Sequence, residues 1–176
     1  ARGGEPISVA FARLAAQLQR VEVDLTRAVE DVTEDLEADL ADVTLSVGAL
    51  PTVIGDPVQL RAVMQNLLSN AAKFRRPDAP ATIDVSGRRH TSSWGEAWRI
   101  VVQDNGLGIP PSARSNVFEP FVRSHTHIPG SGIGLATVKS VVEAHGGQIG
   151  VDETPGGGAC VWFDLPVRAA EPRRSR

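Results

Sequence analysis

Three polar side chains recur at helical spacing in the stretch 59–74: Asn66, Asn70 and Lys73. Side chains three or four positions apart on a helix share a face, so two amides and one ammonium would point into the same space. An amide oxygen can bind Mg²⁺, an amide NH2 can donate to a phosphate oxygen, and a lysine adds positive charge. The alternative is a surface helix with scattered polar residues. Two asparagines one turn apart destabilise a helix, which favours a functional role.

The helix that would carry these side chains is predicted by apolar residues of the same period, which would form its buried face. They are Leu60, Val63, Met64, Leu67, Leu68 and Ala71. Asp56 and Pro57 come just before them as a capping residue and a first-turn proline, so we expect the helix to begin there.

A carboxylate and two glycines occupy the segment 104–109, directly after a predicted strand over 97–103. Asp104 at the end of a strand can accept a hydrogen bond from a ligand donor such as an exocyclic amine. Gly106 and Gly108 would let the backbone approach that ligand closely. The same residue types are also common in plain Asx turns.

A second glycine segment, residues 130–135, immediately precedes a helix predicted over 135–145. Its successive backbone N–H groups can form an anion-binding nest, which the helix N-terminus would reinforce. It is not a Walker P-loop, because no Gly-Lys-Ser/Thr follows, and no strand directly precedes it as in dinucleotide-binding folds. Taken alone, each glycine segment leaves the ligand open.

Composition limits the class of protein. The chain has 176 residues, of which 41% are hydrophobic and 22% charged, as in an ordinary globular domain. A net charge of -3 gives no electrostatic case for nucleic acid. The one cysteine excludes an internal disulfide and fits a reducing compartment. No apolar run approaches the ~18 residues of a membrane span. Because the chain begins Ala-Arg-Gly-Gly and its only methionine is Met64, we expect a fragment or a processed chain.

Helices and strands alternate irregularly along the chain, which predicts an α/β fold: a two-layer sandwich with helices on one face of a mixed, largely antiparallel sheet. A further helix is expected within 25–40, and strands over 21–25, 43–47, 51–54, 81–88, 97–103, 148–152 and 159–165. A polar loop containing His90 and Trp94 should join the strands 81–88 and 97–103. We expect a linker or the end of a preceding helix over 1–20, one domain over 21–167 and a disordered basic tail over 168–176.

In combination these segments are far more specific. Their order and spacing resemble the catalytic, ATP-binding domain of sensor histidine kinases, in the gyrase, Hsp90, histidine kinase and MutL superfamily. Residues 66–74 (NLLSNAAKF) match the N box, 104–109 (DNGLGI) the first glycine box, 118–123 (FEPFVR) the F box and 130–135 (GSGIGL) the second glycine box. The resemblance covers about residues 21–167, and its compact lid is similar to that of phytochrome-type kinases.

The resemblance implies a Bergerat-type ATP-binding fold with ATP and Mg²⁺ as ligands. Asn66 would bind Mg²⁺, and Asn70 and Lys73 would contact phosphate oxygens. Asp104 would accept from the adenine amine, with Phe74 packed beside the base. The implied catalytic residues are Asn66, Lys73 and Arg123, the last in an ATP lid over 118–134. The other implied nucleotide-binding residues are Gly106, Gly108, Ile109, Phe121, Gly130, Ser131, Gly132, Ile133, Gly134 and Leu135.

Two positions depart from the family pattern. Cys160 stands where many relatives have a threonine near the base, which puts one water-mediated adenine contact in doubt. Ala62 stands four residues before Asn66, where gyrase-like members have a glutamate that activates water. Because alanine cannot act as a base, this difference favours phosphoryl transfer over ATP hydrolysis.

The resemblance also implies a phosphate acceptor, a histidine on a separate dimerisation domain of the same protein. His90, His125, His127 and His145 lack the acidic helical setting of that acceptor, so we expect it elsewhere in the parent protein. For His125 and His127, mobile lid residues are favoured over a metal site, since no third ligand is in view. We further expect a cognate response regulator, a homodimeric parent around a monomeric fragment, and a cytoplasmic location with the parent membrane-anchored or soluble. This fragment itself should contact neither nucleic acid nor membrane.

Three other functions stay open within the superfamily or its fold: an ATP-gated clamp of the gyrase/Hsp90 kind, an anti-sigma-factor-like serine kinase, and an inactive regulatory domain that binds nucleotide. Ala62 and the F box argue against the clamp. The F box and lid match sensor kinases better than the serine kinase. Intact Asn66, Lys73 and Asp104 argue against an inactive domain.

Overall fold

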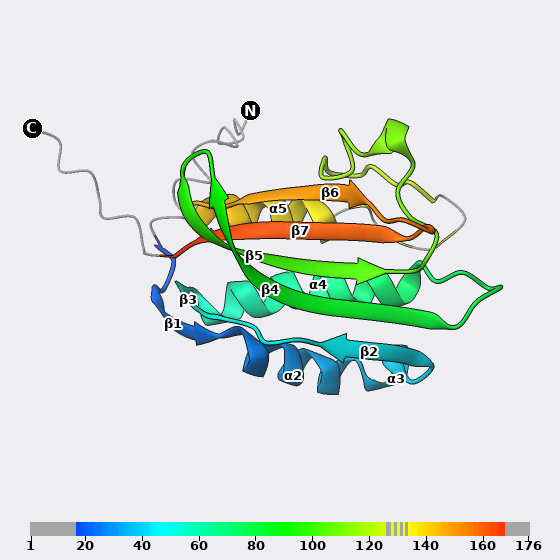
Figure 1. Cartoon of the computed structure of the whole chain (residues 1–176), viewed down its shortest axis with the longest axis horizontal. Coiled ribbons are helices and arrows are strands. Elements are labelled where there is room, and N and C mark those ends of the chain that lie inside the picture. Colours follow the sequence, from blue (N-terminus) through cyan, green and yellow to red (C-terminus); the bar gives the residue numbers. More distant parts are fainter. Residues whose placement is uncertain (1–16, 126–127, 129, 131, 133, 168–176) are drawn as a thin grey trace, which may run out of the picture.

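The chain folds into two layers, a β-sheet and a layer of helices that covers one face of the sheet (Figure 1). The computed structural model describes residues 17–125, 128, 130, 132 and 134–167. In chain order the elements are β1 (Val21–Asp24), α2 (Leu25–Asp35), α3 (Glu37–Leu40), β2 (Val43–Val47), β3 (Thr52–Gly55), α4 (Pro57–Lys73), β4 (Ala81–Ser92), β5 (Gly95–Asp104), the 3₁₀ turn η1 (Pro111–Ala113), α5 (Gly134–Ala144), β6 (Gln148–Glu153) and β7 (Ala159–Pro166).

Five strands form the main sheet in the order β2-β4-β5-β7-β6, and β1 pairs with β3 in a separate two-stranded sheet. β2 runs parallel to β4, whereas the other neighbours in the main sheet are antiparallel. This arrangement confirms the predicted α/β sandwich with a mixed, largely antiparallel sheet.

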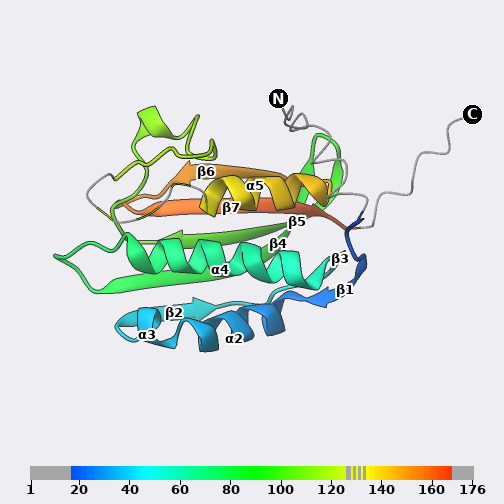
Figure 2. The same ribbon diagram turned by 180° about the vertical axis from the view of Figure 1, so that it is seen from behind.

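α4 lies at the centre of the helical layer, between α2 and α5 (Figure 2). Asp56 caps its start, since Oδ1 accepts from the backbone N–H groups of Val58 at 3.0 Å and Gln59 at 3.1 Å. All six apolar residues predicted for its inner face are buried. Because that face is packed against the sheet, the stripe that begins at Asn66 and ends at Lys73 lies along the side of the helix.

Two predicted elements differ from the structure. The helix expected within 25–40 is interrupted at Leu36, whose φ of -100° and ψ of 18° are not helical, so α2 and α3 are separate. Leu36 and Leu40 are nevertheless both buried, as the apolar pattern predicts. The apolar pattern therefore predicts the buried face correctly but contains no signal for the break at Leu36.

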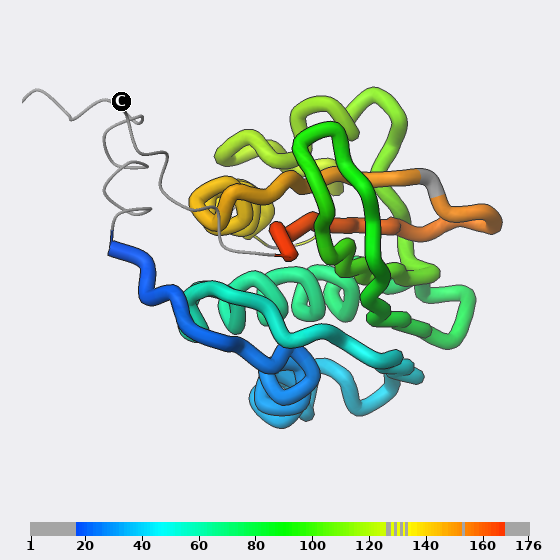
Figure 3. The backbone as a smooth tube through the Cα atoms, turned by 60° about the vertical axis from the view of Figure 1, so that its left-hand side comes forward, coloured from blue at the N-terminus to red at the C-terminus, as the bar shows by residue number. Residues whose placement is uncertain are grey.

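The predicted polar loop around His90 and Trp94 is instead a β-hairpin, because β4 and β5 pair as far as Ser92 and Gly95. Figure 3 shows this hairpin, in green, extending beyond the other strands of the sheet. The outer part of the hairpin, residues 89–96, lacks apolar alternation, so the sequence predicted a loop there. Cross-strand contacts hold them instead: the Arg89 guanidinium lies 4.6 Å from the Trp98 ring centroid.

The ends of the chain are described only in part. Residues 17–20 lead into β1, while the rest of the expected N-terminal segment and the expected tail over 168–176 lie outside the described residues. Among the helices that are described, none is long and apolar enough to cross a membrane.

Candidate functional site

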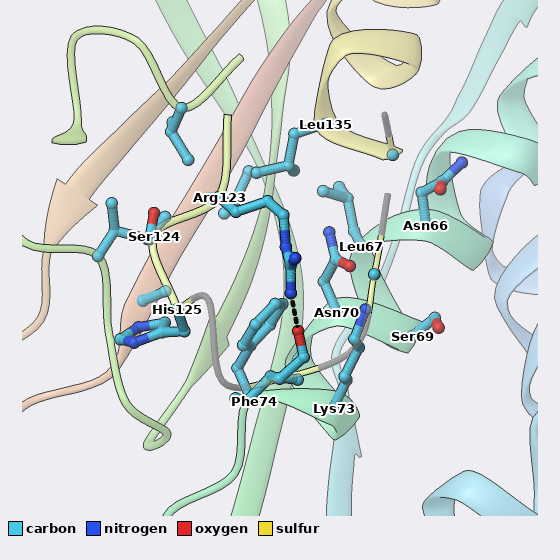
Figure 4. A pocket seen from close by; sticks show the side chains of 18 of the residues that line it. Asn66, Leu67, Ser69, Asn70, Lys73, Phe74, Arg123, Ser124, His125 and Leu135 are labelled. Atoms are coloured by element: carbon cyan, nitrogen blue, oxygen red, sulfur yellow. Dashed lines mark hydrogen bonds between the residues drawn. The ribbon is translucent and has the colours of Figure 1, made fainter. Parts of the chain in front are cut away.

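A pocket of about 360 Å³ opens between the side of α4, the end of β5, the loop that follows the F box and the start of α5. Figure 4 shows Asn70, Lys73 and Arg123 beside Phe74 and His125 around this pocket. The predicted site residues that line it are Asn66, Asn70, Lys73, Phe74, Asp104, Gly108, Ile109, Arg123, Gly130, Gly132, Gly134 and Leu135. Segments that are separate in sequence therefore meet at one pocket.

One end of the pocket is polar and lies where α4 faces the second glycine segment. The Asn66 Nδ2 donates to the Ala62 carbonyl at 2.9 Å, so its Oδ1 is left to face the start of α5. A Cβ on Gly134 would lie 3.0 Å from that Oδ1, and a Cβ on Gly130 would collide with the Lys73 ammonium. Glycine at both positions leaves room beside an amide oxygen and a cation. Such a donor set fits phosphates and a Mg²⁺ ion bound to them.

The other end of the pocket is set by Asp104, the last residue of β5. Its Oδ1 accepts from the backbone N–H groups of Gly106 at 2.8 Å and Ala159 at 3.2 Å. No donor from the described part of the chain bonds to Oδ2, which leaves that oxygen to a ligand. Burial raises the pKa of Asp104 above its ordinary value, and the two backbone hydrogen bonds offset part of that shift.

Gly106 lies next to the pocket rather than in its wall. A Cβ there would collide with the Phe74 carbonyl oxygen, and the next residue, Leu107, donates its N–H to that oxygen at 2.9 Å. The first glycine turn is thereby attached to the C-terminal end of α4. Gly106 thus has a structural role that brings Asp104 and the α4 stripe together.

Apolar walls complete the pocket, and the sequence motifs did not include most of them. They are Leu67, Ala71, Val102, Val117, Val122, Ala159 and Val161. Ala159 and Val161 alternate along β7 with Cys160, which therefore lies on the opposite face of the sheet and does not line the pocket. The threonine-like contact that the sequence put in doubt at position 160 is therefore not available from Cys160, and its neighbour Ala159 lines the pocket instead. The side chain of Cys160 is also only half-buried.

Other predicted lid residues are distributed differently. Phe121 does not line the pocket: it is 74% exposed and has a φ of 66°, with its N–H bonded to the Gly132 carbonyl at 3.0 Å. Arg123 does line the pocket and donates from Nη2 to the Ile128 carbonyl. Ser131 and Ile133 lie outside the described residues, as does His127.

A protein-only metal site is not formed by the described residues, among which no three His, Cys, Asp or Glu side chains gather at coordinating range. A Mg²⁺ ion at this pocket would therefore depend on the Asn66 amide oxygen and on the phosphates of a ligand.

The family model described as histidine kinase-, DNA gyrase B-, and HSP90-like ATPase matches residues 55–169, which include both glycine segments and the α4 stripe. The chain belongs to this family. The match confirms the family predicted from the motifs.

Individual relatives agree with this membership. The chain is 36% identical over 156 residues to the phytochrome-like protein Cph1 of Synechocystis, a match that covers 86% of this chain but 20% of Cph1. Among solved structures, the mycobacterial sensor histidine kinase MprB has a TM-score of 0.74 at 35% identity, covering 86% of this chain and 99% of that one. Full-length ShkA, solved in complex with AMPPNP, has a TM-score of 0.71 at 31% identity, covering 94% of this chain and 35% of ShkA.

Proposed function

We propose that this chain is the ATP-binding catalytic domain of a sensor histidine kinase. It would transfer the γ-phosphoryl group of ATP to a histidine on a dimerisation domain of the same protein. Family membership and the likeness to MprB support this proposal. Because the chain spans only 20% of the length of Cph1, the activity of the whole protein is an inference from this part of it.

A single observation carries the proposal: one pocket has the half-buried Asp104 carboxylate at one end, and at the other the amide-and-ammonium stripe of α4 faces glycine backbone. Asp104 Oδ2 would accept from the adenine amine, so the base lies at the apolar end. Asn66, Asn70 and Lys73 would then face the phosphates. ShkA, a structure with the same fold, is recorded with AMPPNP bound.

The residues of this chain would act by positioning and charge neutralisation, which dominate catalysis of phosphoryl transfer. Lys73 would hold the phosphates, and Asn66 would hold a Mg²⁺ ion, which when bound supplies positive charge to the phosphate oxygens. Arg123 would move from the Ile128 carbonyl to the terminal phosphate. At position 62, the alanine offers no base to activate water, so transfer is favoured over hydrolysis.

Partners and location follow from the same proposal. The histidine acceptor would come from a dimerisation domain of a homodimeric parent protein, and a response regulator would take the phosphoryl group from it. A cytoplasmic location belongs to the same proposal, because the domain would need ATP as its substrate. ATP-gated clamps of the same family remain the second candidate, favoured by no observation beyond the shared family model.

The test is transfer of labelled phosphate from ATP to the histidine-containing domain of the parent protein. Lys73→Met should lower the rate of phosphoryl transfer about tenfold or more, because it removes a positioned cation that stabilises the negative charge on the phosphoryl group being transferred. Lys139→Met is the matched control, since Lys139 lies on α5 and pairs with Glu143 at 4.0 Å, away from the pocket. Acid-labile label on histidine supports the proposal. Label on serine, or none with the wild-type chain, would contradict it.

A further inference from the structure

His125, which the sequence predicted to be a mobile lid residue, has defined contacts with two other parts of the pocket. Its Nε2 lies 2.8 Å from the carbonyl oxygen of Gly108 in the first glycine turn. Its ring centroid lies 5.7 Å from that of Phe74 at the end of α4, with the two planes inclined by 42°. Figure 4 shows His125 and Phe74 around the same pocket. His125 therefore connects the loop after the F box to both the turn and the helix.

The contact with Gly108 fixes the tautomer of the imidazole. A carbonyl oxygen can only accept, so Nε2 of His125 carries the proton and donates it. Gly108 has a φ of 73°, and a Cβ there would lie 2.8 Å from the Gly158 carbonyl oxygen. The turn is thus packed against the loop that enters β7, which holds the acceptor in place. His125 therefore donates to a carbonyl oxygen, that of Gly108, whose position is fixed by the packing of the glycine turn.

The contact with Phe74 places His125 at the apolar end of the pocket. A centroid separation of 5.7 Å is within the range at which aromatic pairs stabilise one another. The Lys73 ammonium approaches the same phenyl ring, 5.3 Å from its centroid. Phe74 therefore lies between the cation of the phosphate end and the imidazole. His125 and Phe74 together form an aromatic wall, with Asp104 lining the same pocket.

We propose that His125 is a nucleotide-binding residue that contacts the adenosine part of the ligand rather than its phosphates. The proposal rests on the proposed ATP site. A purine whose amine is bonded to Asp104 presents flat faces to the walls beside it, and bases stack on aromatic side chains. His125, held by Gly108, supplies such a surface where α4 and the glycine turn leave the pocket open. It makes the lid segment part of the base site.

The experiment is calorimetric titration of adenosine, ADP and ATP into the wild-type chain, His125→Ala and His125→Phe. We expect His125→Ala to weaken all three ligands by a similar factor, about 3- to 10-fold, because all three contain the base. His125→Phe keeps an aromatic ring and removes the N–H donor, so its loss should be smaller. His90→Ala in β4 is the matched control and should bind all three ligands as the wild type does.

Several results would overturn this assignment. Unchanged adenosine affinity in His125→Ala would do so, whether or not ATP binding falls, because the residue would then not contact the base. A loss in His125→Phe equal to that in His125→Ala would show that the ring is not what binds. Failure of the wild-type chain to bind any of the three ligands would overturn both this inference and the proposed function. Retained wild-type binding with an unaffected His125→Ala would overturn this inference alone.

Discussion

At the scale of single residues, Asp104 shows how much of a site a motif predicts. The sequence placed its carboxylate at a strand end, and the structure confirms that position. The second backbone donor that fixes Oδ1 comes from Ala159, which is 55 positions away. A motif that is local in sequence contains no signal for a contact made by strand pairing. For the same reason the sequence did not identify Ala159 as a residue that lines the pocket.

Gly130 offers a test of the close approach between the second glycine segment and α4. In Gly130→Ala the new Cβ would displace the Lys73 ammonium, which is the flexible end of a long side chain. We therefore expect weaker ATP binding, by about 3-fold or more, with the free energy of unfolding changed by less than about 0.5 kcal/mol. Calorimetric titration and urea unfolding measure the two effects.

Gly48→Ala is the matched control, because a Cβ there would meet only ordinary contacts, the nearest at 3.6 Å. It should leave ATP affinity unchanged. Wild-type ATP affinity in Gly130→Ala would show that Lys73 is not held at this glycine when the nucleotide binds.

At the scale of elements, His145 joins the start of α4 to the end of α5. Its Nδ1 donates to the Val141 carbonyl at 2.7 Å, and its Nε2 accepts from the Asp56 N–H at 3.0 Å. It is buried, and burial lowers the pKa of its imidazole below the ordinary value. Both helices that line the pocket are thereby fixed at the ends remote from it. His145 therefore has a packing and hydrogen-bonding role at the end of α5.

We expect His145→Phe to lower the free energy of unfolding by about 1–3 kcal/mol, since a buried N–H on Asp56 loses its acceptor. Val58→Ala, at an exposed position of the same helix end, should change it by less than about 0.5 kcal/mol. Urea unfolding measures both. If His145→Phe lowered the free energy of unfolding no more than Val58→Ala does, His145 would not connect α4 to α5 as described.

The loss of stability in His145→Phe should depend on pH in a definite direction. Because the folded-state pKa of His145 is lowered, the unfolded chain takes up a proton first as pH falls. The stabilisation is fully present above the ordinary histidine pKa of about 6.5 and is lost as pH falls through the folded-state value. The stability difference between the wild type and His145→Phe should therefore shrink as the solution is acidified. A difference that grows towards low pH would contradict this.

At the scale of the whole molecule, the two faces of the sheet have different roles. The helix-covered face carries the pocket, while the opposite face carries a buried ion pair between β5 and β7. Arg99 binds Asp164 through two hydrogen bonds of 2.8 Å each, and Asp164 is 0% exposed. The Arg99 guanidinium also lies 3.8 Å from the Trp162 ring centroid. Arg99, which the sequence alone does not distinguish from a surface cation, thus stabilises the sheet.

Arg99→Ala should lower the free energy of unfolding by about 3–5 kcal/mol, because it leaves the buried Asp164 carboxylate without its partner. ATP affinity should be unchanged, since neither residue lines the pocket. The double variant Arg99→Met with Asp164→Leu should recover most of the loss, because no buried charge remains. Urea unfolding checks both variants. A double variant less stable than Arg99→Ala would contradict the assignment.

The overall architecture was predictable because the four motif segments are specific in combination, and the alternating strands follow ordinary burial patterns. What the sequence could not supply came from long-range packing. The Asp104 carboxylate is held by Ala159, Phe121 lies outside the pocket, and His125 lies against Gly108 and Phe74. Each depends on where distant segments meet, which periodicity along the chain does not specify.

The most direct test of the central claim is calorimetric titration of ATP with Mg²⁺ into the wild-type chain and Asp104→Asn. The asparagine keeps an acceptor for the Gly106 and Ala159 N–H groups but replaces Oδ2 by an NH2 donor. Asp84→Asn, at an exposed position of β4, is the matched control. We predict wild-type binding in roughly the micromolar to sub-millimolar range, weakened about tenfold or more in Asp104→Asn only. No binding by the folded wild-type chain, or equal binding by Asp104→Asn, would contradict the account.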